Sequence, residues 1–350
     1  MKSIALPDSA LPISVLDLVG LHPGESTTSA IARSADLARH VESFGYTRYW
    51  LAEHHSIAGL ACSATSVLIG HIAAATSSIR VGSGGIMLPN HAPLVIAEQF
   101  GTLEALYPDR IDLGLGRAPG GDFATMRALR RDLNQDGDDF PALLSELQSY
   151  LGPSRPGQRV HAFPGEGSNV PITLLGSSTY SAALAAAQSL PFAFAAHFAP
   201  QSLYAAAQIY LENFKPGPTL PKPHLIVAIP LIAAETDAAA QRLFTTPQQR
   251  FLRLIRNQPV ESLPPVDSME GLWQPWERDA VEARLAQAIV GSESTVKAGL
   301  EQLISQTHAN EIIAVTDTWD HNARIDSYRR LAAVAQTIHV DTANVANVPA

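Results

Sequence analysis

Short apolar segments alternate with longer segments of helical period along most of the chain. Continuous apolar runs rich in β-branched residues are typical of parallel strands that are buried on both faces. The expected strands cover residues 13–19, 49–52, 79–88, 111–115, 172–175, 192–195, 225–233 and 312–316. Alanine- and leucine-rich helical segments are expected at residues 29–43, 62–76, 93–107, 140–151, 179–188 and 200–214. About eight such units predict an α/β fold, a closed TIM (β/α)8 barrel with insertion loops.

The same alternation bears on the number of domains. A length of 350 residues admits two domains, but the unbroken pattern favours a single barrel domain over residues 1–340. Gly45 is placed to end the first helix in a left-handed conformation, and Pro93 to begin a later one. Two segments rich in glycine or proline, residues 152–169 and 256–277, exceed a minimal barrel, and both lids and plain insertions fit them. Residues 341–350 are small and polar and predict a flexible tail.

Composition narrows the classes of function. The chain has 24 Lys and Arg against 33 Asp and Glu, a net charge of -9, and no basic run, which argues against nucleic acid as a partner. Hydrophobic residues make up 46% and charged residues 16%, as expected for a globular protein. A single cysteine, Cys62, excludes a disulfide framework and favours a cytoplasmic location. Residues 1–20 fit neither a signal peptide nor a membrane span, so no membrane partner is expected.

Several common reaction signatures are missing from the sequence. Residues 82–85 and 114–116 are glycine-rich, but Met87 and Pro119 stand where the third glycine of a dinucleotide fingerprint would fall. The sequence also lacks a phosphate-binding P-loop, the H-E-x-x-H zinc motif and the G-x-S-x-G hydrolase elbow. The function therefore has to be sought at the ends of the predicted strands.

Polar residues gather where four of the predicted strands end. The carboxyl ends of the strands of a parallel barrel meet at one mouth, which is where active sites form. The four segments are Glu53-His54-His55, residues 82–89, Gly116-Arg117 and residues 176–181. We therefore expect these loops to face a common ligand.

The loop after the fifth predicted strand contains Gly176, Ser177, Ser178 and Tyr180 and directly precedes a predicted helix. Free backbone N–H groups and hydroxyls at a helix start, together with the helix dipole, form an anion site. An ordinary Ser/Thr helix cap explains the same residues without a ligand. Arg117 at the end of the neighbouring strand favours the anion site, because a guanidinium there can pair with the same phosphate.

Two other strand ends allow both a functional and a structural interpretation. Gly84 and Gly85 interrupt a β-rich run, which indicates a bulge or a flat ligand against the backbone, or else close packing against a helix. Paired His54 and His55 suit proton transfer, while one buried and one solvated histidine is the simpler alternative. Adjacent histidines project to opposite sides of an extended chain, so no metal site is expected from them.

These residues, taken together, resemble the bacterial luciferase-like flavin monooxygenases, in particular members with a single type of subunit. The resemblance covers roughly residues 12–330 in the expected order. It is carried by residues 49–55 (YWLAEHH), 80–89 (RVGSGGIMLP) with His91 and Pro93, 110–117 (RIDLGLGR), Gly176-Ser177-Ser178 with Tyr180-Ser181, 190–195 (LPFAFA), 290–292 and 311–313.

The resemblance implies a barrel that binds FMN at its carboxyl end, usually as a dimer. Arg117, Ser177 and Tyr180 fall where such proteins hold the phosphate, so that the expected cofactor-binding residues are Gly84, Gly85, Arg117, Gly176, Ser177, Ser178 and Tyr180. Gly84-Gly85 matches the place of a non-proline cis peptide against the flavin ring. His54 aligns with the family's catalytic histidine and Glu53 with a supporting acidic position. Gly176 stands where the light-emitting subunit of luciferase has an acidic residue, so light emission is not expected.

The function expected from the resemblance is that of an FMN-dependent monooxygenase. It would use O2 and reduced FMN, supplied as a co-substrate by a separate flavin reductase, to oxidise a small organic substrate. Two alternatives stay open on the sequence: a flavin-binding barrel without turnover, and an oxidoreductase that transfers hydride with a deazaflavin coenzyme. Function resides in the site and the fold alone does not separate these.

Overall fold

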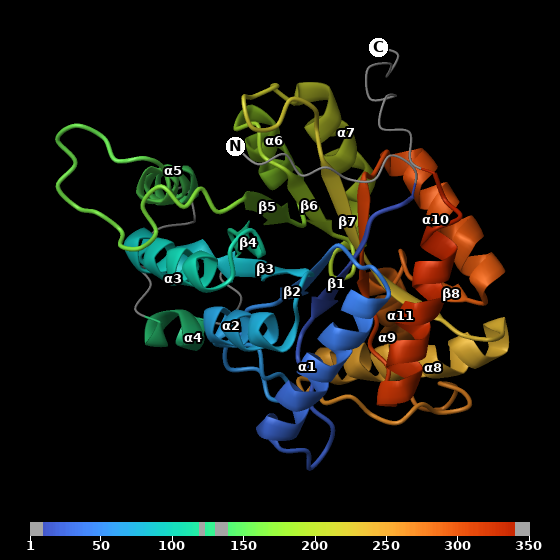
Figure 1. Cartoon of the computed structure of the whole chain (residues 1–350). Helices are drawn as coiled ribbons and strands as arrows, with labels where there is room; N and C mark the ends of the chain where they lie inside the picture. Colours follow the sequence, from blue (N-terminus) through green and yellow to red (C-terminus); the bar gives the residue numbers. More distant parts are fainter. Residues whose placement is uncertain (1–9, 119–122, 130–138, 340–350) are drawn as a thin grey trace.

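A computed structural model describes residues 10–118, 123–129 and 139–339. The expected tail at residues 341–350 lies outside the described residues. Helices surround a central set of strands (Figure 1). Among the described helices, none combines the length and the apolar character that crossing a membrane requires.

Eight parallel strands close into the predicted barrel. The ladder runs from β1 to β7 in chain order, with β9 after β7, and β9 also pairs with β1 and so completes the ring. The strands are β1 (Ile13–Asp17), β2 (Arg48–Leu51), β3 (Arg80–Met87), β4 (Ile111–Gly116), β5 (Ile172–Gly176), β6 (Phe192–Ala195), β7 (Leu225–Ala233) and β9 (Glu311–Val315). A ninth strand, β8 (Ile289–Gly291), pairs only with the carboxyl half of β7. The (β/α)8 prediction is confirmed.

The helices predicted as far as residue 214 are present with shifts of a few residues. Five described helices were not predicted: α4, α8, α9, α10 and α11. The helices are α1 (Thr27–Ser43), α2 (Thr65–Ala75), α3 (Pro93–Leu106), α4 (Phe123–Ala128), α5 (Phe140–Leu151), α6 (Thr179–Ala187), α7 (Leu203–Asn213), α8 (Asp237–Ile255), α9 (Pro275–Arg284), α10 (Glu293–Thr307) and α11 (His321–Ala335), with short 3-10 turns at Leu88–Asn90 and Pro200–Ser202. Gly45 ends the first helix with φ +84°, and Pro93 begins α3, as predicted.

The two long segments lie at opposite ends of the barrel. Residues 152–169 join the end of α5 to the start of β5, which places them at the amino ends of the strands, and Figure 1 shows this segment projecting outward beside α5. They pack on α3, where a Cβ on Gly101 would come within 2.1 Å of Gly165. The lid interpretation is therefore wrong for this segment, because a lid has to reach the carboxyl ends.

The other segment, predicted over residues 256–277, is shorter, because Pro275 and the capping box of Gln274 and Glu277 begin α9. Its backbone is fixed to the loops that follow β1 and β2. The N–H of Ser262 donates to the carbonyl of Leu21 at 2.9 Å, and that of Val260 to Ala58 at 3.0 Å. The segment therefore forms a fixed wall of the mouth.

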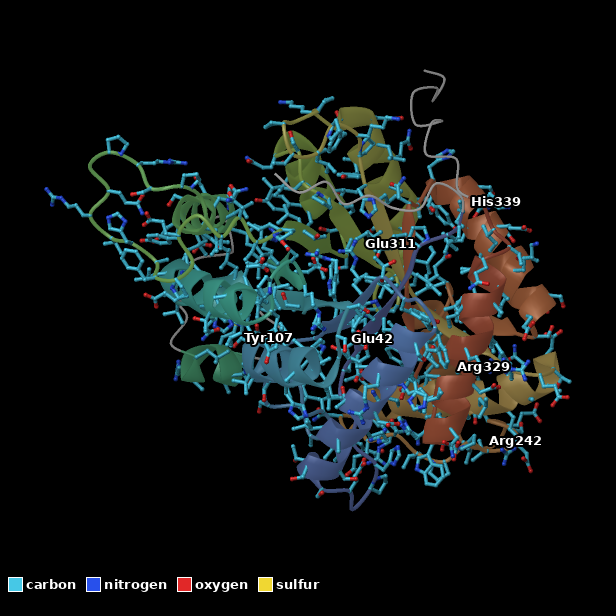
Figure 2. All side chains as sticks on the ribbon, viewed as in Figure 1. Glu42, Tyr107, Arg242, Glu311, Arg329 and His339 are labelled. Carbon is cyan, nitrogen blue, oxygen red and sulfur yellow. The ribbon has the colours of Figure 1, made fainter. Side chains whose placement is uncertain are left out.

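A network of buried charges fills the amino end of the barrel. Arg48, at the start of β2, donates to Glu311 at 2.7 and 2.9 Å and to Asp112 at 2.9 Å. Arg80 donates to Asp112 at 2.6 Å and His224 contacts Glu311 at 3.1 Å. Glu311, which is labelled in Figure 2, is completely buried. Every charged group named here has a partner of opposite sign or a hydrogen-bond donor, so the charges at this end are compensated within the fold.

Candidate active site

Arg117 and Tyr180 meet at the carboxyl end of the barrel. Arg117 directly follows β4, Tyr180 lies in the first turn of α6, and the guanidinium carbon is 4.3 Å from the centre of the tyrosine ring. In the part of the chain that the structure describes, no carboxylate forms an ion pair with Arg117. A cation that is stacked on a ring but has no carboxylate partner is available to an anionic ligand.

The start of α6 leaves its N–H groups available. Ser178 is the N-cap residue, yet its side chain makes no capping hydrogen bond. By contrast, the hydroxyl of Ser26 at the start of α1 accepts from the N–H of Ser29 at 3.2 Å. Ser178 therefore does not act as a side-chain cap, and the simpler interpretation of this loop loses its main support. Together with Arg117 and Ser177, the helix start has the donors that a phosphate group requires.

Gly176 and the Gly84-Gly85 pair have packing reasons to be glycine. A Cβ on Gly176 would lie 2.4 Å from Cβ of Ser181. The Gly84-Gly85 peptide is cis, as the resemblance implied, and the pairing of β3 with β4 shifts register there, as in a bulge. A Cβ on Gly84 would meet Leu16 at 2.8 Å, and one on Gly85 would meet the carbonyl of Gly114 at the same distance. Contacts with neighbouring strands therefore account for the missing side chains of Gly84 and Gly85, and contact with α6 accounts for that of Gly176.

Glu53 is the centre of a histidine cluster after β2. One carboxylate oxygen, Oε1, contacts Nε2 of His55 at 2.8 Å and Nε2 of His91 at 2.9 Å, and the other accepts the N–H of Met87 at 3.1 Å. Burial alone would raise the pKa of Glu53, but these hydrogen bonds, above all that of His91, hold the pKa below its ordinary value. Glu53 is therefore ionised and fixes both imidazole rings.

The three residues of this cluster also have the side chains of a metal site. Ligand-type atoms of Glu53, His55 and His91 lie within 4.8 Å of one another. Both ring nitrogens approach the same oxygen at hydrogen-bond distance, so the cluster satisfies its polar atoms without an ion. The expectation that this chain holds no metal stays a prediction.

His54 belongs to a different pair of histidines. Burial lowers the pKa of His54 despite the nearby charge of Glu53, so its ring is neutral near pH 7 and can accept a proton. His197, two residues after β6, lies close enough to be affected by the charge of His54. Burial, followed by that charge, lowers the pKa of His197 to about 4. Two neutral imidazoles therefore follow the carboxyl ends of β2 and β6.

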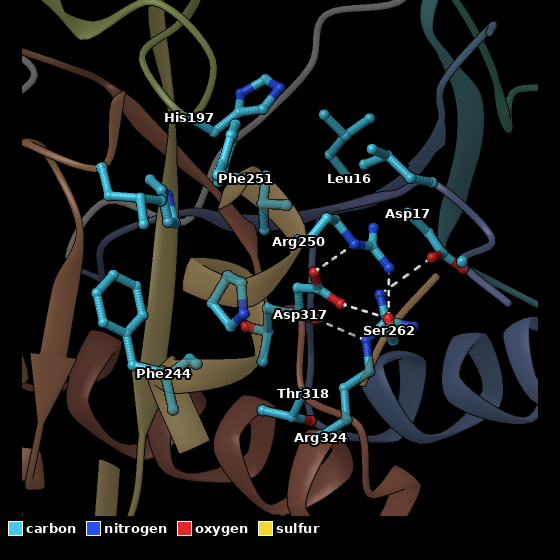
Figure 3. A pocket seen from close by; sticks show the side chains of 18 of the residues that line it. Leu16, Asp17, His197, Phe244, Arg250, Phe251, Ser262, Asp317, Thr318 and Arg324 are labelled. Carbon is cyan, nitrogen blue, oxygen red and sulfur yellow. Dashed lines mark hydrogen bonds and ion pairs between the residues drawn. The ribbon is translucent and has the colours of Figure 1, made fainter. Parts of the chain in front are cut away.

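A cavity lined in part by His197 opens at the carboxyl ends of β1, β7 and β9. Figure 3 shows its lining side chains, with His197 and Phe251 near one end and an ion pair of Arg250 and Asp317 across the middle. The cavity has an empty volume of about 740 Å³, counting the open mouth. A cleft at the carboxyl ends of barrel strands is a common place for a small-molecule site.

The sequence did not reveal His197, His91 or Arg250 as residues of the site. His197 follows a strand end, so the argument applied to four other strands would have found it. His91 is near Glu53 only because the end of β3 turns back toward β2, and Arg250 lies on α8, which the apolar pattern did not predict. Contacts of this kind depend on the tertiary fold.

Comparison with known proteins agrees with the fold and the site. The sequence profile described as luciferase-like monooxygenase matches residues 11–311. The chain is 48% identical over 323 residues to a luciferase-like monooxygenase of Escherichia coli (strain K12), covering 92% of this chain and 96% of that protein. It is 52% identical to YvbT of Bacillus subtilis (strain 168), which is described as uncharacterized, with the same coverage.

Solved structures show the same architecture. The crystal structure of apo-MsnO8 aligns with a TM-score of 0.83 and 35% identity, covering 94% of this chain and 99% of that one. More distant structures share the fold alone. They include the oxygenating constituent of 3,6-diketocamphane monooxygenase of Pseudomonas putida in complex with FMN (TM-score 0.72, 18% identity, 94% and 99% coverage) and an F420-dependent secondary alcohol dehydrogenase (TM-score 0.65, 13% identity, 93% and 99% coverage).

This chain belongs to the luciferase-like monooxygenase family, as the resemblance in the sequence indicated. Its relatives that are named as monooxygenases support an oxidoreductase. The structural neighbours include proteins that use FMN and proteins that use the deazaflavin coenzyme F420.

Proposed function

We propose that the protein is an FMN-dependent monooxygenase that oxidises a small organic substrate with O2. The observation that carries the proposal is the cradle formed by Arg117, stacked on Tyr180, and the start of α6, where Ser178 does not cap the helix. A monophosphate is the ligand that suits a free guanidinium and free N–H groups. The residues present therefore fit FMN, whose tail is a phosphate, better than a flavin without one.

The roles of the other residues follow from their surroundings. Reduced FMN, when bound, supplies the electrons that activate dioxygen. His54, half-buried and neutral, can accept a proton at its unprotonated ring nitrogen and return it in a later step. Glu53 is a positioning residue, because its carboxylate holds His55 and His91 in place. The wall of residues 256–274 helps to keep water out of the mouth.

A titration of the purified protein with FMN, riboflavin and the deazaflavin coenzyme, side by side, tests the cofactor. We expect FMN to bind at least tenfold more tightly than riboflavin, since a charge-assisted phosphate contact is worth about 1.5–3 kcal/mol. Preference for the deazaflavin coenzyme would instead support hydride transfer. Incorporation of one oxygen atom from ¹⁸O2 into a product, detected by mass spectrometry, then separates a monooxygenase from a barrel that only binds flavin.

We also propose that a separate flavin reductase supplies the reduced FMN. The sequence lacks a dinucleotide fingerprint, which supports this division of labour. NADH or NADPH mixed with the protein, FMN and O2 should be oxidised no faster than by FMN alone, and addition of an unrelated flavin reductase should start turnover. Rapid oxidation of either nicotinamide without a reductase would contradict this proposal.

A homodimer is the proposed assembly. The outer faces of the adjacent helices α2 and α3 carry exposed apolar side chains: Val67 is 71% exposed, Leu106 63% and Val95 43%. Exposed apolar surface on neighbouring helices is typical of a subunit interface. Light scattering should give about twice the 37.3 kDa of one chain, and Val67→Glu should shift the mass toward the monomer. A monomeric parent protein would refute the dimer.

A further inference from the structure

The cavity beside His197 has walls of two kinds. Large apolar side chains form most of the surface, from or next to β1, β7, β9, α8 and the end of α9. They are Leu16, Leu18, Ile232, Phe244, Phe251, Leu285 and Val315. A surface of this type favours an apolar ligand body, because burying it removes apolar area from water.

The charged residues of the cavity are neutralised within the chain. Arg250 pairs with Asp317 at 3.0 Å, and Arg324 with Asp17 at the same distance. The third arginine, Arg33, pairs at 2.7 Å with a glutamate just outside the cavity. Figure 3 shows the Arg250 and Asp317 side chains pointing toward each other. No lining arginine is left for an anionic ligand without breaking a pair that is largely buried.

The lining hydroxyls are also occupied. Ser262 contacts both Arg250 and Asp317, Thr316 donates to the carbonyl of Leu231 at 2.7 Å, and Thr318 donates to that of Asp320 at 3.1 Å. These side chains hold the walls together. They offer a ligand few free hydrogen-bonding positions.

Among the described lining residues, two side chains have a buried nitrogen without a hydrogen bond, His197 and Arg250. Arg250 still has its ion-pair partner Asp317, and His197 has none. The Nδ1 atom of His197 is buried and has no hydrogen-bond partner among the described residues. A buried polar atom without a partner costs free energy, which a ligand group can recover by bonding to it. His197 is also near enough to His54 for the charge of His54 to lower the pKa of His197.

We propose that this cavity binds the substrate, and that the substrate is an uncharged, mostly apolar molecule whose single polar group hydrogen bonds to Nδ1 of His197. This inference rests on the proposed function in one respect, namely that the bound molecule is the one oxidised. The binding itself depends only on the side chains of the cavity. His197 is thus a group that orients the substrate and discriminates against charged compounds.

Three probes of similar shape test the proposal by isothermal titration calorimetry, with and without FMN. Benzylacetone has one uncharged carbonyl, hydrocinnamate carries a carboxylate in the same place, and n-butylbenzene has no polar group. We expect benzylacetone to bind more tightly than either of the others, and at least tenfold more tightly than hydrocinnamate, because a charge would have to be buried without a partner.

Variants of His197 provide the control. His197→Phe keeps a ring but removes Nδ1, and should weaken benzylacetone roughly threefold to tenfold while leaving n-butylbenzene unchanged. His197→Asn places an amide near the position of Nδ1 and should restore most of the loss. Both variants should keep the FMN affinity of the parent, which shows that they are folded.

The outcomes separate this inference from the proposed function. If hydrocinnamate binds more tightly than benzylacetone, Arg250 has exchanged its ion pair with Asp317 for one with the ligand. That result would overturn the inference. Equal weakening of all three probes in His197→Phe would also overturn it, because the loss would then be one of shape. If the probes behave as expected but the protein does not bind FMN, the cavity assignment stands and the monooxygenase proposal fails.

Discussion

The two ends of the barrel use charged and titratable side chains in opposite ways. At the amino end, Arg48 is 4% exposed and joins Glu311 and Asp112 in a network in which each charge is paired. At the carboxyl end, Arg117 is stacked on a ring without a carboxylate partner among the described residues, and His197 has a buried nitrogen without a hydrogen bond. The polar groups at the amino end are thus satisfied within the chain, whereas those at the carboxyl end can still bind a ligand.

This difference separates residues that stabilise the fold from residues that bind. A buried pair in which one partner is removed leaves an uncompensated charge, so changes at the amino end should act on stability. Polar groups without partners stabilise little on their own, so changes at the carboxyl end should act on ligand binding and turnover. The two ends can therefore be tested by variants that affect one property and spare the other.

The largest effect is expected for His54. His54→Ala should lower the rate of substrate oxidation by about 10²- to 10⁴-fold, because an acid/base group of this kind typically contributes that factor. FMN affinity, measured by flavin fluorescence, should remain close to that of the parent. His161→Ala, in the 152–169 segment at the amino end, is the matched control and should leave the rate unchanged. A His54→Ala protein of undiminished rate would remove His54 from the mechanism.

Arg48→Met should have the next largest effect, and on stability. It leaves Glu311 and Asp112 buried without their cation, and we expect a loss of about 3–5 kcal/mol in the free energy of unfolding, measured with urea. The control is Arg242→Met, since Arg242 lies at the periphery in Figure 2 and its side chain is 54% exposed in its pair with Asp267. That change should cost less than about 1 kcal/mol. Similar losses for both variants would contradict the distinction between the two ends.

The barrel could be predicted from the sequence because its strands are encoded locally. Each of the eight is an apolar run with a helical segment near it, and their boundaries fall within a few residues of those predicted. The described helices beyond residue 214 were missed for local reasons too: α8 contains Pro247, and the strand before α10 has only three residues. Short or interrupted elements depend on tertiary packing for their stability.

The candidate site was predictable only in part, for a related reason. Residues next to strand ends, such as Arg117, Tyr180 and His54, follow from the rule that parallel strands meet at one mouth. The pair of Arg250 and Asp317 joins residues far apart in the sequence and requires the fold to be known. Whether residues 152–169 form a lid also required the fold. The segment leads from α5 into the start of β5, so it lies at the amino ends of the strands, away from the mouth.

Arg117→Ala sharpens the comparison at the carboxyl end. Removal of the guanidinium should weaken FMN about 10- to 100-fold, because a charge-assisted contact to the phosphate is lost. Riboflavin, which has no phosphate, should bind the variant as it binds the parent. Tyr180→Leu removes only the ring on which Arg117 stacks and should have a smaller effect. Equal losses for FMN and riboflavin would refute the phosphate assignment.

The smallest effect concerns the response of stability to pH. The pKa of His197 is about 4 in the folded protein and about 6.5 in an unfolded chain, so between these values the unfolded state binds more protons. Stability should therefore fall as the pH is lowered from about 6.5 to about 4, by at most about 3 kcal/mol from this residue. Below pH 4 the contribution stays constant, because the ring is protonated in both states.

His197→Phe isolates this contribution, since phenylalanine cannot be protonated. Urea unfolding of the parent and the variant at several pH values between 4 and 7 should give free energies of unfolding that converge or cross as the pH falls, because the variant loses less stability.

The carboxylates of the amino end also lose stability as the pH falls, but at lower pH values. The pKa of Glu311 is held below its ordinary value despite burial, chiefly by Arg48. Their contribution is lost only below about pH 4 and is common to both proteins. If the free energies of unfolding of parent and variant change in parallel above pH 4, His197 has an ordinary pKa in the folded protein. The contrast between the two ends of the barrel would then depend on Arg117 alone.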